Sequence, residues 1–231
     1  MLKGKRQVAY VMLITAIFFY SCEKEVISNL FDIDGNEYKT ITIGKQVWMA
    51  ENLKVTHYRD GTAITNVTDN AAWAALTTEA YSIFNNNSSN ELDTYGALYN
   101  WYAVANVHNI APEGWHVATD TEWTELETYL SNNGHNGTEG TALKSTTGFW
   151  STFWKGKGNG TDDYGFTTLP GGYRKCNNGY YSDMGTNCSF WSATEHDSFT
   201  AWYRQLHFID SDVTQDTSDK EYGYSVRLVR D

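Results

Sequence analysis

Aromatic residues and glycines alternate through the last third of the chain, and this pattern limits what the chain can fold into. The chain has nine tryptophans, sixteen tyrosines and nineteen glycines but only two prolines. Glycine interrupts helices and permits tight turns, whereas Trp, Tyr and Phe favour strands. The pattern therefore predicts short β-segments joined by long loops. The segments that carry it are 148–150, 164–166, 169–174, 179–181 and 190–194.

Alternation of apolar and polar residues predicts further β-structure. Residues 38–49 alternate on either side of Gly44, which predicts a hairpin. Residues 202–208 and 224–228 have the same period of two and predict strands. A turn at 112–114 is predicted to lead into a short strand at 115–117.

Helices are predicted in three places. Thr119 and Glu122 have the spacing of a capping box, and apolar residues recur on one face as far as Leu130. Residues 95–105 carry apolar side chains at helical spacing, which predicts an amphipathic helix, and a shorter helix is expected around 71–76. The predicted fold class is therefore α+β, with the two longer helices packed on short antiparallel strands and long loops.

The N-terminal segment has the organisation of an export signal. Lys3, Lys5 and Arg6 precede an uncharged run of 13 residues, 8–20. A membrane-spanning helix needs about 20 apolar residues, so this run favours a signal peptide over residues 1–21.

Cys22 directly follows this segment. A small residue before a cysteine, here Ser21, resembles the cleavage site of bacterial lipoproteins of the Bacteroidetes type. The resemblance implies lipidation of Cys22, a tether over 22–29, a domain over 30–231, and a membrane as a partner through the lipid anchor. The charged stretch 23–25 is similar to the signal for surface display, so we expect an outer-membrane lipoprotein exposed on the cell surface.

The charge of the mature chain excludes one class of partner. The net charge of −11 becomes −14 once the three basic residues of segment 1–21 are removed. A domain this acidic repels nucleic acid, so no nucleic-acid partner is expected.

Two further cysteines, Cys176 and Cys188, flank a turn-rich segment. In an oxidising compartment they are predicted to form a disulfide, which would stabilise the fold by about 3 kcal/mol. The alternative is a catalytic or metal-binding pair, which neither a Cys-x-x-Cys spacing nor an adjacent histidine supports.

Several blocks in order resemble the Fibrobacter succinogenes major paralogous domain family. They are residues 34–54, 95–103, 111–130, 141–145, 162–174, 190–195, 201–206 and 223–231. The order of helix, loop and short strands also looks like the C-type lectin-like fold, including the branch of the formylglycine-generating enzymes. That resemblance implies architecture and not activity.

The C-type lectin-like resemblance implies a ligand site in the loops before the last strands. Aromatic and polar side chains suited to sugar faces and hydroxyls lie there. The ligand-binding candidates are Trp191, Glu195, His196, Asp197 and Tyr203. No cofactor is expected, although calcium is a further prediction for the acidic segment that contains Asp210, Asp212 and Asp216.

The sequence favours binding over catalysis. The six histidines show no metal-ligand spacing, and there is no nucleophile elbow, P-loop or dinucleotide-binding loop. We therefore expect a binding or adhesion module for a glycan or another surface component. The alternatives are an enzyme, either formylglycine-generating-like or carbohydrate-active, and a structural surface protein.

Overall fold

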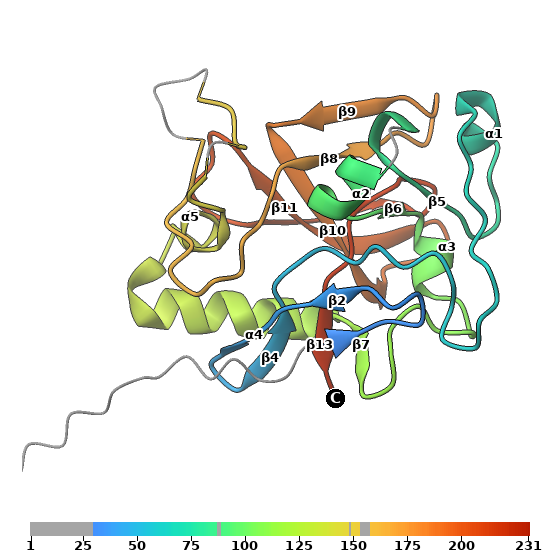
Figure 1. Ribbon diagram of the computed structural model, residues 1–231. Helices are drawn as coiled ribbons and strands as arrows, with labels where there is room; N and C mark the ends of the chain where they lie inside the picture. The colour runs from blue at the N-terminus through green and yellow to red at the C-terminus, as the bar shows by residue number, and fades with distance from the viewer. Residues whose placement is uncertain (1–29, 87–88, 148, 153–157) are drawn as a thin grey trace, which may run out of the picture.

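A computed structural model describes residues 30–86, 89–147, 149–152 and 158–231 (Figure 1). The predicted signal peptide, Cys22 and tether lie outside the described residues. Within the described ranges, no helix is both long and apolar enough to cross a membrane.

The described residues form a mixed α+β structure, which confirms the coarse fold class. The helices are α1 (Asn70–Ala74), α2 (Ser89–Tyr95), α3 (Trp101–Val104), α4 (Asp120–Leu130) and α5 (Glu139–Leu143), with a short 3-10 turn at Phe84–Asn86 and a π-helical turn at Ser131–His135. The strands before α4 are β1 (Leu30–Phe31), β2 (Glu37–Tyr38), β3 (Thr40–Ile43), β4 (Gln46–Met49), β5 (Tyr81–Ser82), β6 (Leu98–Tyr99) and β7 (Trp115–Val117). The later strands are β8 (Gly171–Arg174), β9 (Tyr181–Met184), β10 (Asn187–Glu195), β11 (Thr200–His207), β12 (Thr214–Asp219) and β13 (Leu228–Arg230).

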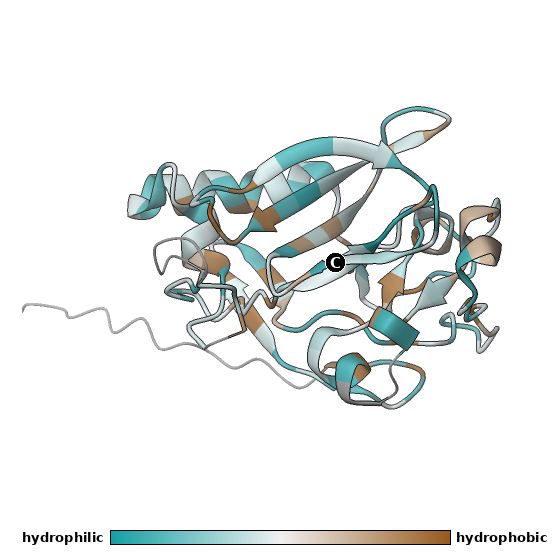
Figure 2. Cartoon of the chain, turned by 90° about the horizontal axis from the view of Figure 1, so that it is seen from above, coloured by the Kyte–Doolittle hydropathy of each residue, from teal (hydrophilic) through white to brown (hydrophobic). Residues whose placement is uncertain are grey.

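The strands form two larger sheets and two small pairs. The five-stranded sheet has the order β12-β11-β10-β8-β9, and the four-stranded sheet has the order β3-β4-β13-β7. The small pairs are β1 with β2 and β5 with β6. Strand β12 lies at the edge of the larger sheet, and its polar residues are mostly exposed. Figure 2 shows the chain from above with its hydrophilic residues in teal.

Helix α4 covers one face of the five-stranded sheet. Its capping box is formed as predicted, with the Thr119 hydroxyl and the Glu122 carboxylate bonding each other's backbone N–H. Trp123 stacks on Phe190 of β10 at a centroid distance of 5.3 Å. The face of the sheet under α4 therefore belongs to the interior.

The hairpin over 38–49, the strand at 115–117 and the helix after Thr119 are confirmed. The helix predicted over 95–105 is wrong, because α2 ends at Tyr95 and Gly96 has a φ of +75°. A Cβ at Gly96 would lie 2.6 Å from the Cβ of Asn52, so the chain turns where only glycine fits. A new helix, α3, then starts at the N-cap Asn100.

Candidate functional site

The five predicted ligand residues do not lie together. Trp191 is completely buried, and its indole N–H donates to the Tyr99 carbonyl at 2.9 Å. It belongs to the core that lies opposite α4. A side chain with no exposed surface cannot stack on a ligand, so Trp191 can only support its neighbours.

Glu195, His196 and Asp197 lie at the tip of the β10–β11 hairpin, where each has a local partner. Asp197 accepts hydrogen bonds from the N–H groups of Phe199 and Thr200, both at 2.8 Å, and these bonds lower its pKa. The ring of His196 meets Trp202 edge-on, and Glu195 forms an ion pair with the buried Lys220. These contacts stabilise the conformation of the hairpin tip.

The three predicted metal ligands are divided between two elements. Asp210 and Asp212 lie in the turn between β11 and β12, whereas Asp216 lies within β12. Among the described residues, no group of three or more His, Cys, Asp or Glu side chains could hold a metal ion. The calcium prediction therefore gains no support from this geometry.

The predicted disulfide is wrong in this structure, where Cys176 and Cys188 are both free. Strands β8 and β10 are parallel, with Cys188 beside Gly172. Cys176 follows Gly172 by four residues, or roughly 13 Å of extended chain. Because a disulfide needs Cα atoms closer than about 7 Å, the parallel register separates the two thiols.

Neither thiol has the environment of a reactive cysteine. Burial raises the pKa of Cys188 to about 12. Burial and the charge of Asp219 also raise the pKa of Cys176. A nucleophilic or metal-binding cysteine needs its thiolate, so these two side chains do not support the catalytic alternative.

Tyr203 leads to a different surface, which sequence reasoning missed. Tyr173 of β8, Tyr203 of β11 and Tyr222 of the last loop are partly exposed around the buried Tyr224. The centroids of the three outer rings lie 6.0, 5.0 and 5.5 Å from that of Tyr224. We call these four residues the tyrosine patch.

The tyrosine patch is built on a rigid base. The ring of Tyr224 lies 4.5 Å from that of Trp191, and its hydroxyl is 2.9 Å from the Ser218 hydroxyl of β12. Tyr203 also meets the Trp191 ring, at 6.4 Å. The outer rings are therefore fixed by packing before any ligand arrives, so binding would cost little side-chain entropy.

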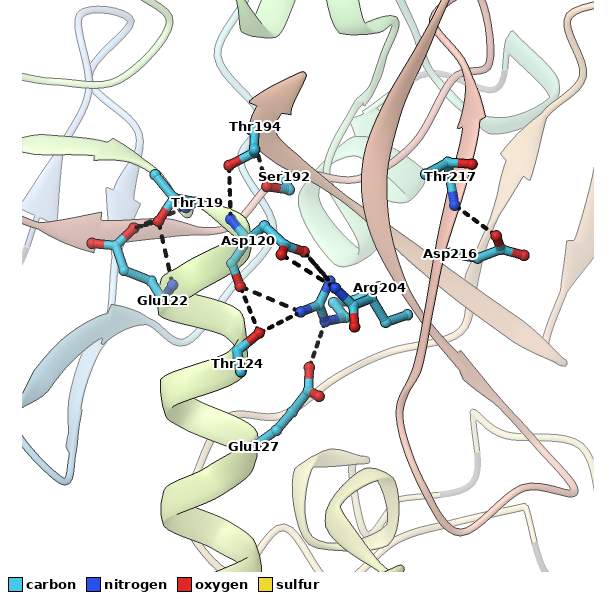
Figure 3. A network of polar contacts seen from close by, with 11 residues as sticks. Thr119, Asp120, Glu122, Thr124, Glu127, Ser192, Thr194, Arg204, Asp216 and Thr217 are labelled. Atoms are coloured by element: carbon cyan, nitrogen blue, oxygen red, sulfur yellow. Dashed lines mark hydrogen bonds and ion pairs between the residues drawn. The ribbon is translucent and has the colours of Figure 1, made fainter. Parts of the chain in front are cut away.

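Three exposed carboxylates border the patch. Asp216 is the direct partner of Tyr203 across the β11–β12 ladder, which places the two side chains on the same face. Burial first, and then the charge of Asp216, raise the pKa of Tyr203. Figure 3 shows Asp216 directed away from Arg204, which faces α4 on the other side of the hairpin.

The other two carboxylates affect the remaining outer tyrosines. Burial, followed by a hydrogen bond and the charge of Asp183, raises the pKa of Tyr173. Burial, with smaller contributions that include Asp219, raises the pKa of Tyr222 to about 12. The phenols are therefore neutral at physiological pH, beside these carboxylates.

Two adjoining hollows form a second candidate site. Their volumes are about 150 and 190 Å³, and they share Ala50, Glu51 and Thr167. The buried Arg227 lines the smaller one, but its guanidinium already donates to the Asn52 side chain and to carbonyl oxygens of the chain. Because protein oxygens already accept the hydrogen bonds of this guanidinium, it has little capacity left to bind a ligand. The hollows are therefore a weaker candidate binding site than the tyrosine patch.

Two tyrosines of the patch lie in sequence segments that were interpreted only as β-strands. Tyr173 occurs in the segment 169–174 and Tyr224 in the strand predicted at 224–228, where the pattern indicated only β-structure, and Tyr222 lies outside both. The bridge between Arg174 and Gly223, which joins these segments in space, leaves no local trace in the sequence.

Comparison with known proteins gives one match. The family model described as the Fibrobacter succinogenes major domain matches residues 41–230. No curated protein and no solved structure matches the chain.

Proposed function

The chain belongs to the Fibrobacter succinogenes major domain family, and from this premise we propose that it is a surface-displayed binding module whose tyrosine patch recognises a glycan. The observation that carries the proposal is the group of three partly exposed tyrosines held around Tyr224 and bordered by carboxylates. Flat aromatic faces pack against the C–H faces of sugars, and carboxylates accept hydrogen bonds from hydroxyls.

The lectin-like character of the fold belongs to the same proposal. In a lectin-like arrangement the ligand meets long loops and the strands beside them. Here Tyr222 comes from a loop, whereas Tyr173 and Tyr203 come from strands. The hairpin tip, which carries the predicted ligand residues Glu195, His196 and Asp197, would then adjoin the site as support.

A glycan array probed with the protein purified in detergent tests the proposal. Tyr203→Ala is expected to lower the affinity for any glycan bound by at least about tenfold, or about 1.4 kcal/mol. Tyr203→Phe keeps the ring and is expected to keep most of the affinity. A blank array with folded protein, or binding that is indifferent to Tyr203→Ala, would sink the proposal in favour of a protein ligand or a structural role.

Display at the surface depends on the lipid anchor proposed at Cys22. Cys22→Ala is expected to abolish palmitate labelling and to move the protein from the membrane fraction to the soluble fraction. Protease added to intact cells should degrade the unsubstituted protein if it faces outward. Unchanged labelling in Cys22→Ala would contradict the anchor without bearing on glycan recognition.

A further inference from the structure

The carboxylates around the tyrosine patch differ from those that stabilise the fold. Asp120 and Glu127 pair with Arg204, and Glu195 pairs with Lys220. In the described part of the chain, no ion pair joins a basic side chain to any of the three acids at the patch. These acids are Asp183, Asp216 and Asp219.

Their hydrogen bonds within the protein are few. Asp216 accepts one from the N–H of Thr217 at 2.8 Å. Asp183 accepts one from the Ser182 hydroxyl at 2.8 Å and one from the Tyr173 phenol. Asp219 accepts a long contact of 3.6 Å from the Cys176 thiol. An ionised carboxylate accepts about four hydrogen bonds, so Asp216 and Asp219 retain most of their capacity for a ligand and Asp183 about half.

Two kinds of group at the patch attract the same charge. The face of an aromatic ring carries the negative part of its quadrupole and attracts a cation within about 6 Å. Carboxylates attract cations directly, and the mature chain is strongly acidic overall. A neutral sugar meets the rings with its C–H faces and the carboxylates only through its hydroxyls, whereas an ammonium group adds a charge attraction to both the rings and the carboxylates.

We propose that the tyrosine patch selects glycans that carry free, protonated amino groups, such as de-N-acetylated hexosamine chains, over their N-acetylated counterparts. The inference rests on the proposed glycan-binding function and names its ligand class. The hexosamine ring packs on Tyr203 and its neighbours, and the ammonium group lies between the ring faces and Asp216.

The test is calorimetry with two hexamers of one backbone, glucosamine and N-acetylglucosamine, at pH 6 and low salt. The amino form is expected to bind at least tenfold more tightly. Its advantage should shrink as NaCl rises from about 0.05 to 0.5 M, because salt screens exposed charges. Equal or tighter binding of the N-acetylated form overturns the inference and leaves glycan recognition intact.

Variants separate recognition at the patch from general attraction to an acidic protein. Asp216→Asn should weaken binding of the amino hexamer about three- to tenfold and leave the acetylated hexamer unchanged. The control Glu125→Gln removes the same charge from the exposed side of α4, across the sheet, and should leave both unchanged.

Three further results overturn the inference. The first is an equal loss in Asp216→Asn and Glu125→Gln, and the second is binding of hexalysine as tight as that of the amino hexamer. Both would mean non-specific attraction. The third is that neither hexamer binds. If the wider glycan array still gives a hit that depends on Tyr203, only the ligand class is wrong; if the array is also blank, the glycan-binding proposal fails with it.

Discussion

The Nε atom of Arg204, on β11, lies 2.5 Å from a carboxylate oxygen of Glu127 on α4 (Figure 3). The guanidinium is completely buried and also meets Asp120 at 2.6 Å. Buried charges are tolerated only when they are paired and hydrogen-bonded. This contact therefore fixes the helix against the sheet and leaves the other face of β11 free to carry Tyr203.

Replacing Arg204 should destabilise the fold strongly. Arg204→Leu leaves Asp120 and Glu127 close together without a cation, and breaking a buried pair in this way costs about 3–5 kcal/mol. Urea denaturation measures the loss. Glu127→Gln, which keeps the shape and leaves Asp120 as a partner, is expected to cost less than half as much, and equal costs would contradict the arrangement.

The stability of the fold should depend on the charge of His116. Hydrogen bonds to Glu122 and Asp231, at 2.7 and 2.6 Å, raise the pKa of His116 to about 9. A raised pKa stabilises the fold below the unfolded value of about 6.5, and this contribution disappears as the pH rises through 9. Urea midpoints of the unsubstituted protein and His116→Gln should differ most near pH 6 and converge above pH 9. A constant difference would contradict the assignment.

The two cysteines should react as separate thiols. In a Cys22→Ala background, alkylation of the unfolded, unreduced protein should count two thiols, because no bridge joins Cys176 to Cys188. In the folded protein, Cys176 is expected to react slowly, and Cys188 only on unfolding, because it is buried with a pKa near 12. Finding no thiol in the unfolded protein would restore the disulfide prediction.

Comparing alanine substitutions at Gly96 and Gly114 distinguishes the cost of backbone strain from the cost of a steric clash. Both have positive φ angles, +75° and +77°, but a Cβ at Gly114 meets open space. Gly114→Ala should therefore cost only the conformational penalty of about 1–2 kcal/mol. Gly96→Ala adds a clash with Asn52 and should cost about 1–3 kcal/mol more. Thermal denaturation compares the two, and equal costs would contradict the close packing at Gly96.

Local patterns in the sequence predicted the elements that local forces determine. The capping box at Thr119, the hairpin around Gly44 and the short strand at 115–117 all depend on residues a few positions apart. The family was also recognisable, because its motifs occur in order along the chain. In each of these cases, residues close together in the sequence were sufficient for the prediction.

The site could not be predicted in the same way, because long-range pairing builds it. Tyr203 was among the candidates, but Tyr173 comes from a strand about 30 positions earlier, on the far side of β10. Trp191 was expected at a surface and instead supports the patch from below. The parallel register of β8 and β10 also separates Cys176 from Cys188, although their closeness in the sequence had suggested a disulfide.

Strand β13 has a consequence for how the protein reaches its destination. It lies between β4 and β7, and residues 223–225 just before it bridge to Arg174, Tyr99 and Phe190. The core thus stays open until this late segment has left the ribosome. For a chain exported as its N-terminal segment predicts, this delay keeps the polypeptide unfolded while the secretion machinery threads it across the membrane.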